Sequence, residues 1–228
     1  FPPPPNTKHK PRIISIREGD ITCERTDVVV ISSNPKLKLG GVVGDFTKKR
    51  GGRSIQKECD KWVESFGSVP YGKIAYTLAG ELPCRFLIHA VPPKWEDDEP
   101  ARENIQLQYQ CTYNCLLLAN AKRYSSISIP PLVSGSKLGI TKVQLAQTMI
   151  QAANDFFARN RHTNIELIHF VLEEKDKEMR DAFEKEFARR FIAGEPKPPS
   201  FLMETSTLNL GQNQNANNAL PSTSPKTN

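Results

Sequence analysis

The sequence lacks any apolar run of the roughly 18–20 residues that a membrane-spanning helix needs. Its first ten residues, FPPPPNTKHK, also lack the continuous apolar region of a secretory signal peptide. We therefore expect no membrane segment and no signal peptide in these 228 residues. The chain does not begin with methionine, and we expect it to be a domain from a longer protein.

Cysteine is scarce and scattered along the chain. The five residues are Cys23, Cys59, Cys84, Cys111 and Cys115. Their number is odd, no two form a CxxC pair, and no pair of histidines lies nearby, so neither a zinc site nor a disulfide framework is expected. We predict no metal, and free thiols in a reducing compartment.

The common nucleotide-binding motifs are also absent. The stretch GGVVG at residues 40–44 has the wrong spacing for the dinucleotide fingerprint GxGxxG, and no GxxxxGK[ST] phosphate loop occurs. A nucleotide diphosphate, if bound, must be held by a different arrangement.

The composition is that of one folded domain with extended ends. Hydrophobic residues make up 38% and charged residues 25% of the chain, and the net charge of +6 favours an anionic partner. Residues 1–11 are proline-rich and predict an extended linker. Residues 194–228 are rich in Asn, Gln, Ser and Pro and predict a disordered tail. The domain is therefore expected at residues 12–193.

Apolar patterns within this domain alternate between strand and helix periodicity. Strands are predicted at residues 12–17, 27–32, 73–78, 85–91, 126–129 and 165–172. Helical stripes lie between them and after them, at residues 55–66, 105–117, 143–157 and 179–191. The alternation predicts an α/β fold, a three-layer α/β/α sandwich with a central mixed β-sheet.

Two loops follow predicted strands at the edge where such sheets bind ligands. In the first, residues 39–52 read LGGVVGDFTKKRGG, and Gly40 and Gly41 can adopt a positive φ before a helix that begins near Val43. The second, residues 130–142, offers small residues before the next helix. Together the loops suit a diphosphate, although each alone is equally well an ordinary strand-to-helix turn.

At this point the sequence resembles the macrodomain family, the ADP-ribose-binding α/β/α module. The matches run in order over residues 13–191: GDIT at 19–22, VVVISSN at 28–34, GGVVG at 40–44, GG at 51–52, GKIA at 72–75, LIHAV at 87–91 with Trp95, and SG at 134–135. The phrases GGVVGDFTKKRGG and IHAVPPKW are most similar to macrodomains of the core-histone macro variants and of multi-macrodomain PARP proteins.

The resemblance implies a role for each matching residue. Asp20 would accept a hydrogen bond from the adenine amino group, the Ile21 amide would donate to the ring, and Asn34 would contact the distal ribose. The remaining matches would surround that ribose and the diphosphate: Gly40, Gly41, Val42, Val43, Gly44, Ser134, Gly135, Ser136, Lys137 and Gly139. His89 lies in an apolar strand and is interpreted as structural.

Departures from the family pattern bear on catalysis. Residues 31–34 read ISSN where hydrolases often read NAAN, and Gly44 stands where many carry an acid. Asp45 comes one residue later, which turns a helical side chain by about 100°. Asn34 and Asp45 are therefore the only catalytic candidates. Lys137 and Glu173 replace aromatic residues that often cover the ribose and the adenine.

Three functions remain open. The first is a reader that binds ADP-ribose, free or as mono-ADP-ribosyl groups on proteins, with little or no hydrolysis. The second is a mono-ADP-ribosyl-protein hydrolase, and the third a degenerate macrodomain that binds nucleic acid or protein through its basic surface. We expect a monomer that needs no cofactor and is located in the nucleus, the cytoplasm or both.

Overall fold

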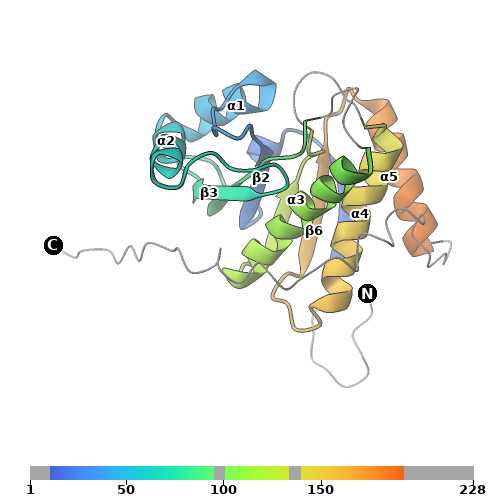
Figure 1. Ribbon diagram of the computed structural model, residues 1–228. Helices are drawn as coiled ribbons and strands as arrows, with labels where there is room; N and C mark the ends of the chain where they lie inside the picture. Colours follow the sequence, from blue (N-terminus) through green and yellow to red (C-terminus); the bar gives the residue numbers. More distant parts are fainter. Residues whose placement is uncertain (1–10, 95–100, 134–139, 193–228) are drawn as a thin grey trace. The chain divides into compact units, whose positions relative to one another are not determined.

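Six strands form one mixed sheet between two layers of helices in the computed structural model, which describes residues 11–94, 101–133 and 140–192 (Figure 1). The described residues belong to one compact unit. The strands, in sheet order, are β1 (Ile13–Glu18), β6 (Leu167–Leu172), β5 (Ser126–Ile129), β2 (Val28–Ser32), β4 (Phe86–Ala90) and β3 (Ile74–Leu78). All neighbours are parallel except β3 and β4, so the predicted mixed sheet is confirmed.

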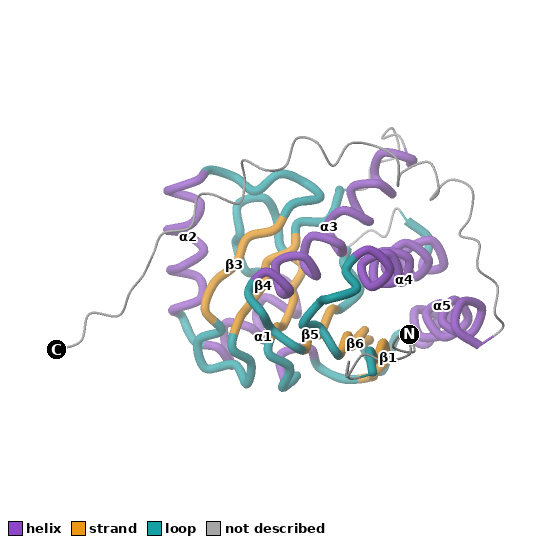
Figure 2. Tube along the Cα trace, turned by 90° about the horizontal axis from the view of Figure 1, so that it is seen from below, coloured by secondary structure: helices purple, strands orange, loops and turns teal. Residues whose placement is uncertain are grey.

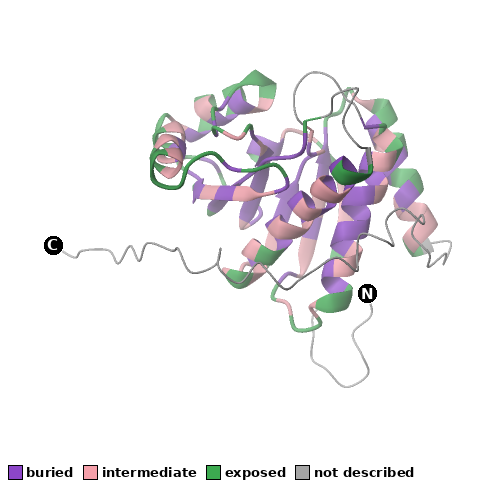
Figure 3. Cartoon of the chain, viewed as in Figure 1, coloured by how far each residue is buried: buried purple, intermediate pink, exposed green. Residues whose placement is uncertain are grey.

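The central strands are buried on both faces, as their continuous apolar runs predict. In β2 the residues Val28 to Ile31 are almost completely buried, and β4 is buried throughout (Figure 3). Val29 and Ile31 join the apolar cluster beneath α2, which includes Ile55 and Cys59. Successive residues of a strand therefore pack against the helices on opposite faces of the sheet.

Helices cover the two faces unequally (Figure 2). α1 (Gly41–Gly51) and α2 (Ser54–Phe66) lie on one face, with the short 3-10 helix η1 (Ile21–Cys23) beside α1. α3 (Ala101–Ala121), α4 (Lys142–Arg159) and α5 (Lys177–Phe187) cover the other face, and a π-helical turn, η2 (Ala188–Ile192), follows α5. The described helices include none with the length and apolar character of a membrane span.

The predicted strand bounds agree with the structure to within two residues, but parts of the helical stripes were wrong. Phe66 and Leu117 were expected in the core and are exposed. Leu117 lies on the outer side of α3, whereas Phe66 shares the face of Ile55 but is the last residue of α2. Phe191 belongs to the π-helical turn and not to a continued α-helix, and it is also exposed. Residues 1–10 of the predicted linker and the whole predicted tail, 194–228, lie outside the described residues.

His89 is a structural histidine, as predicted from its apolar strand. Its ring is completely buried, with Nε2 2.9 Å from the Thr77 hydroxyl and Nδ1 3.4 Å from that of Ser33. Burial lowers the pKa of His89 to about 4, so the ring is neutral at physiological pH. A buried neutral imidazole with internal partners is part of the core and cannot reach a ligand.

The end of α1 is joined to the turn between β3 and β4. Gly80 has a φ of +58°, and a Cβ there would collide with the carbonyl oxygen of Gly51. The amide of Glu81 donates a hydrogen bond to that same oxygen at 3.1 Å. Glycine at position 80 therefore permits a backbone-to-backbone contact that fixes where α1 ends.

Gly80→Ala is expected to lower the free energy of unfolding by about 2–4 kcal/mol, from positive-φ strain of about 1 kcal/mol plus the collision. Gly67 is the matched control, because its φ is +79° and a Cβ there meets nothing within 4 Å. Gly67→Ala should cost less, because it carries only backbone strain, about 1–3 kcal/mol for its φ of +79° and ψ of −171°. Urea unfolding of the two variants measures the difference, and equal costs would contradict the proposed contact.

Candidate functional site

The sheet has a topological switch point between β2 and β5. The chain leaves β2 into α1 on one face and leaves β5 towards α4 on the opposite face, while the two strands lie side by side and parallel (Figure 1). In open α/β sheets, ligands bind in the crevice outside the carboxyl ends of strands at such a point. The two loops singled out from the sequence both emerge here, from β2 and from β5.

The amino terminus of α1 is built to receive an anion. Gly40 and Gly41 are exposed, Gly41 has a φ of +65°, and a Cβ on either would meet nothing within 4 Å. Among the described residues, no side chain caps the helix. The first N–H groups of a helix have no partner within it and carry a partial positive charge, so they are available to a ligand. The helix begins two residues before the predicted Val43.

The amino terminus of α4 differs, because the chain caps it. The Thr141 hydroxyl accepts a hydrogen bond from the Gln144 amide at 3.1 Å, and the Gln144 side chain accepts one from the Thr141 amide at 3.3 Å. This capping box was missed, although the pattern Thr-x-x-Gln signals it in the sequence. The predicted ligand-binding residues Ser134, Gly135, Ser136, Lys137 and Gly139 lie outside the described residues.

Asn34 is used by its own loop. Its side-chain oxygen accepts hydrogen bonds from the amides of Lys36 and Lys38, at 3.0 and 3.2 Å, and its nitrogen donates to the Lys38 carbonyl at 2.8 Å. The side chain is exposed at the carboxyl end of β2. Asn34 thus lies at the predicted edge of the sheet, but its amide group shapes the loop before α1.

Position 44 has no room for a side chain. A Cβ on the buried Gly44 would lie 2.9 Å from the carbonyl carbon of Leu39 and 3.2 Å from its Cα. Asp45 points outward, since its side chain is 68% exposed and pairs with Lys48 at 2.8 Å along the helix. Neither of the positions considered for a catalytic acid therefore directs a carboxylate into the crevice.

Asp20 follows β1 and is held by two partners. Its Oδ1 accepts hydrogen bonds from the Thr22 amide at 2.9 Å and the Thr22 hydroxyl at 2.7 Å. Its Oδ2 lies 3.3 Å from the guanidinium of Arg50, near the end of α1. Ile21 is buried beside it. The sequence analysis did not single out Arg50, which lies within the stretch LGGVVGDFTKKRGG of residues 39–52.

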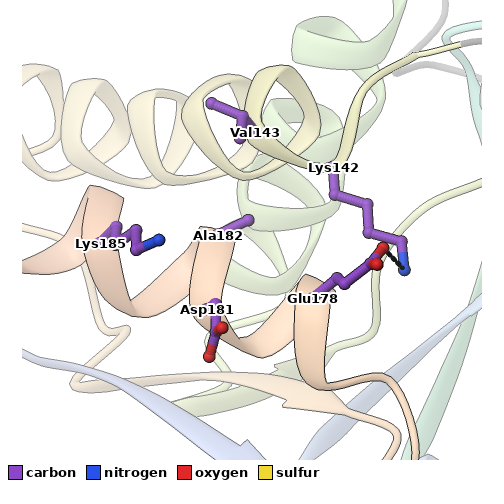
Figure 4. A pocket seen from close by; sticks show the side chains of 6 residues that line it. All are labelled: Lys142, Val143, Glu178, Asp181, Ala182 and Lys185. Atoms are coloured by element: carbon purple, nitrogen blue, oxygen red, sulfur yellow. Dashed lines mark ion pairs between the residues drawn. The ribbon is translucent and has the colours of Figure 1, made fainter.

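Two surface hollows are found among the described residues, and one of them borders the Arg50 that pairs with Asp20. The larger, of about 360 Å³, is a groove between α4 and α5, where Lys142 pairs with Glu178 at 3.1 Å (Figure 4). Lys142 also contacts Asp176 at 2.5 Å, and these hydrogen bonds raise the pKa of Lys142. The other hollow, of about 260 Å³, borders Arg50 and includes Arg25, Cys23 and Glu81. Within the described residues, no group of three or more His, Cys, Asp or Glu could hold a metal.

Comparison with known proteins gives one consistent result. The family description "Macro domain" matches residues 30–149. An O-acetyl-ADP-ribose deacetylase of Escherichia fergusonii is 34% identical over 158 residues, which are 69% of this chain and 86% of that protein. An uncharacterized protein of Thermotoga maritima is 34% identical over 181 residues, 79% of this chain, but the match spans only 29% of its length.

Solved structures agree with the sequence relatives. The structure titled as the Oceanobacillus iheyensis macrodomain with ADP superposes with a TM-score of 0.69 at 29% identity, and the match covers 77% of this chain and 90% of that one. The chain therefore belongs to the macrodomain family.

Proposed function

We propose that this protein binds ADP-ribose, free or as mono-ADP-ribosyl groups on proteins, and acts as a reader with little or no hydrolysis. The observation that carries the proposal is the uncapped amino terminus of α1 at the switch point, with Gly40 and Gly41 open in front of it. The name of the Escherichia fergusonii relative and the ADP complex of the Oceanobacillus iheyensis macrodomain support this ligand class.

The direction in which the ligand lies follows from the arrangement of charge in the site. The first amides of α1 attract the diphosphate, because a helix amino terminus favours negative charge. Asp20 lies beyond the end of β1, where its Oδ2 can accept a hydrogen bond from the adenine amino group. The adenosine end therefore extends towards η1, and the distal ribose lies over the loop of residues 34–41.

The described side chains favour binding over cleavage. A general base must lie within hydrogen-bonding reach of the water that it activates. Asp45 faces solvent with Lys48, Gly44 excludes a side chain, and the amide group of Asn34 is bonded to its own loop. His89 is buried and neutral. These residues offer a cradle without a positioned carboxylate.

A second candidate is removal of an acyl or ADP-ribosyl group, favoured by the name O-acetyl-ADP-ribose deacetylase given to relatives from Escherichia fergusonii and Escherichia coli. In that case Asn34 would have to release Lys38 and orient a water. Substrate oxygens would then assist the attack, because the described loop supplies no carboxylate to do so.

Gly41→Glu is expected to weaken ADP-ribose binding at least about 100-fold in a calorimetric titration up to about 1 mM ligand. The new carboxylate would fill the space before α1 and repel the diphosphate, and a like charge about 4 Å away costs about 4 kcal/mol at an effective dielectric of 20. Gly67→Glu is the matched control, because it has the same open surroundings and a similar positive φ. Equal affinities of the two variants would refute the proposed pose.

Incubation with O-acetyl-ADP-ribose or a mono-ADP-ribosylated protein is expected to release no product above the buffer level over several hours. The Escherichia fergusonii relative is the comparison enzyme for the acetyl substrate. Release of product that disappears in Asn34→Ala would instead establish the second candidate. Salt-sensitive binding of RNA without competition from ADP-ribose would indicate the third function considered from the sequence.

A further inference from the structure

The place where the family resemblance puts an aromatic residue over adenine carries an acid in this chain. Glu173 follows β6 and is exposed. It lies beside Asp20, because the Gly19 amide donates a hydrogen bond to the Leu172 carbonyl at 2.9 Å. A carboxylate offers no flat apolar surface to a base, so a base bound at Asp20 needs its stacking partner from another element.

One face of α1 supplies an exposed ring near Asp20. Val42, Phe46 and Arg50 are spaced by four residues and therefore share a side of the helix. Val42 is 67% and Phe46 is 41% exposed, which is unusual for two large apolar side chains in succession on one helix face. The face begins at the anion-binding amides and ends at the ion pair with Asp20.

Arg50 connects the ring to the carboxylate. Its guanidinium carbon lies 5.9 Å from the centre of the Phe46 ring, and its NH2 group lies 3.3 Å from Asp20 Oδ2. A cation near an aromatic face is favourable and restricts the ring. In the described part of the chain no other aromatic ring packs on Phe46, whereas the exposed Phe66 packs on Trp62 at 5.0 Å.

We propose that Phe46 is the aromatic platform for the adenine base and that Arg50 positions both this ring and the Asp20 carboxylate. The inference rests on the proposed function and assigns a binding residue to that same site. Oδ1 of Asp20 already accepts two hydrogen bonds from Thr22, so Oδ2 is the oxygen that receives the adenine amino group. Stacking of a base on an aromatic ring contributes about 1–3 kcal/mol, equivalent to about a 5- to 150-fold change in affinity.

The test compares ADP-ribose affinities by calorimetry. Phe46→Ala and Phe46→Leu are expected to bind at least about 5-fold more weakly, because both remove the π surface and the leucine keeps apolar bulk. Phe46→Trp should bind as tightly as the unchanged chain or more tightly. Phe66→Ala, a matched exposed phenylalanine on α2, should change the affinity less than 2-fold. Melting temperatures without ligand verify that each variant is folded.

Nuclear magnetic resonance gives an independent readout. The adenine H2 and H8 protons should shift upfield on binding to the unchanged chain, and this shift should be lost with Phe46→Leu. Unchanged affinity and unchanged proton shifts in Phe46→Leu would overturn the inference while the proposed function stands. A wild-type chain that binds no ADP-ribose at 1 mM would overturn the proposed function, and this inference with it.

Discussion

The close approach of α1 to the loop before it determines most of the site. Gly44 packs so tightly on the backbone of Leu39 that no side chain fits between them. Leu39 is itself buried, and its amide is held by Gln56 of α2 at 2.8 Å. α1 therefore lies close over the loop, and this position directs the first amides of the helix into the crevice. The same contact removes the position from which a carboxylate could act.

The amino termini of α1 and α4 face one crevice but differ in the backbone amides that they leave available to a ligand. α4 satisfies the amides of Thr141 and Gln144 with its own side chains, and α1 has no such cap among the described residues. An anion that binds at α1 therefore replaces a missing cap. The basic residues in the last turn of α1 complement the opposite end of the helix dipole, and Arg50 also pairs with Asp20. One helix thus organises both ends of the proposed ligand.

The sheet could be predicted from the sequence because the spacing of apolar residues indicates which residues are buried. The β-branched run of β2 predicts a strand buried on both faces, and the alternating β1 predicts a half-buried strand, which the structure places at an edge of the sheet. Side-chain direction was harder to predict. The direction of Asp45 depends on the residue at which α1 begins, which the glycines left uncertain by two positions. The hydrogen bonds of the Asn34 side chain to its own loop depend on a five-residue turn, which the periodicity of apolar residues does not indicate.

Polar contacts over long sequence separations could not be predicted at all. Glu24 is buried against Ser128 at 2.8 Å and His169 at 3.1 Å, more than a hundred residues away. Such a network exists only after the strands have assembled. The ion pair of Arg50 could not be predicted either. Its partner, Asp20, lies thirty residues earlier, and the residues next to Arg50 indicate an ordinary solvated helix end.

The junction of Gly51 with Gly80 extends the influence of the site to the far end of the sheet. The turn between β3 and β4 cannot move without moving the last turn of α1, because two backbones meet there with no side chain between them. Arg50 is the residue before that junction, so the register of α1 beside Asp20 is fixed from a turn that no ligand at the crevice would reach. A substitution in this turn would therefore change the affinity for the ligand without touching it. A survey limited to the residues that contact the ligand would miss such a position.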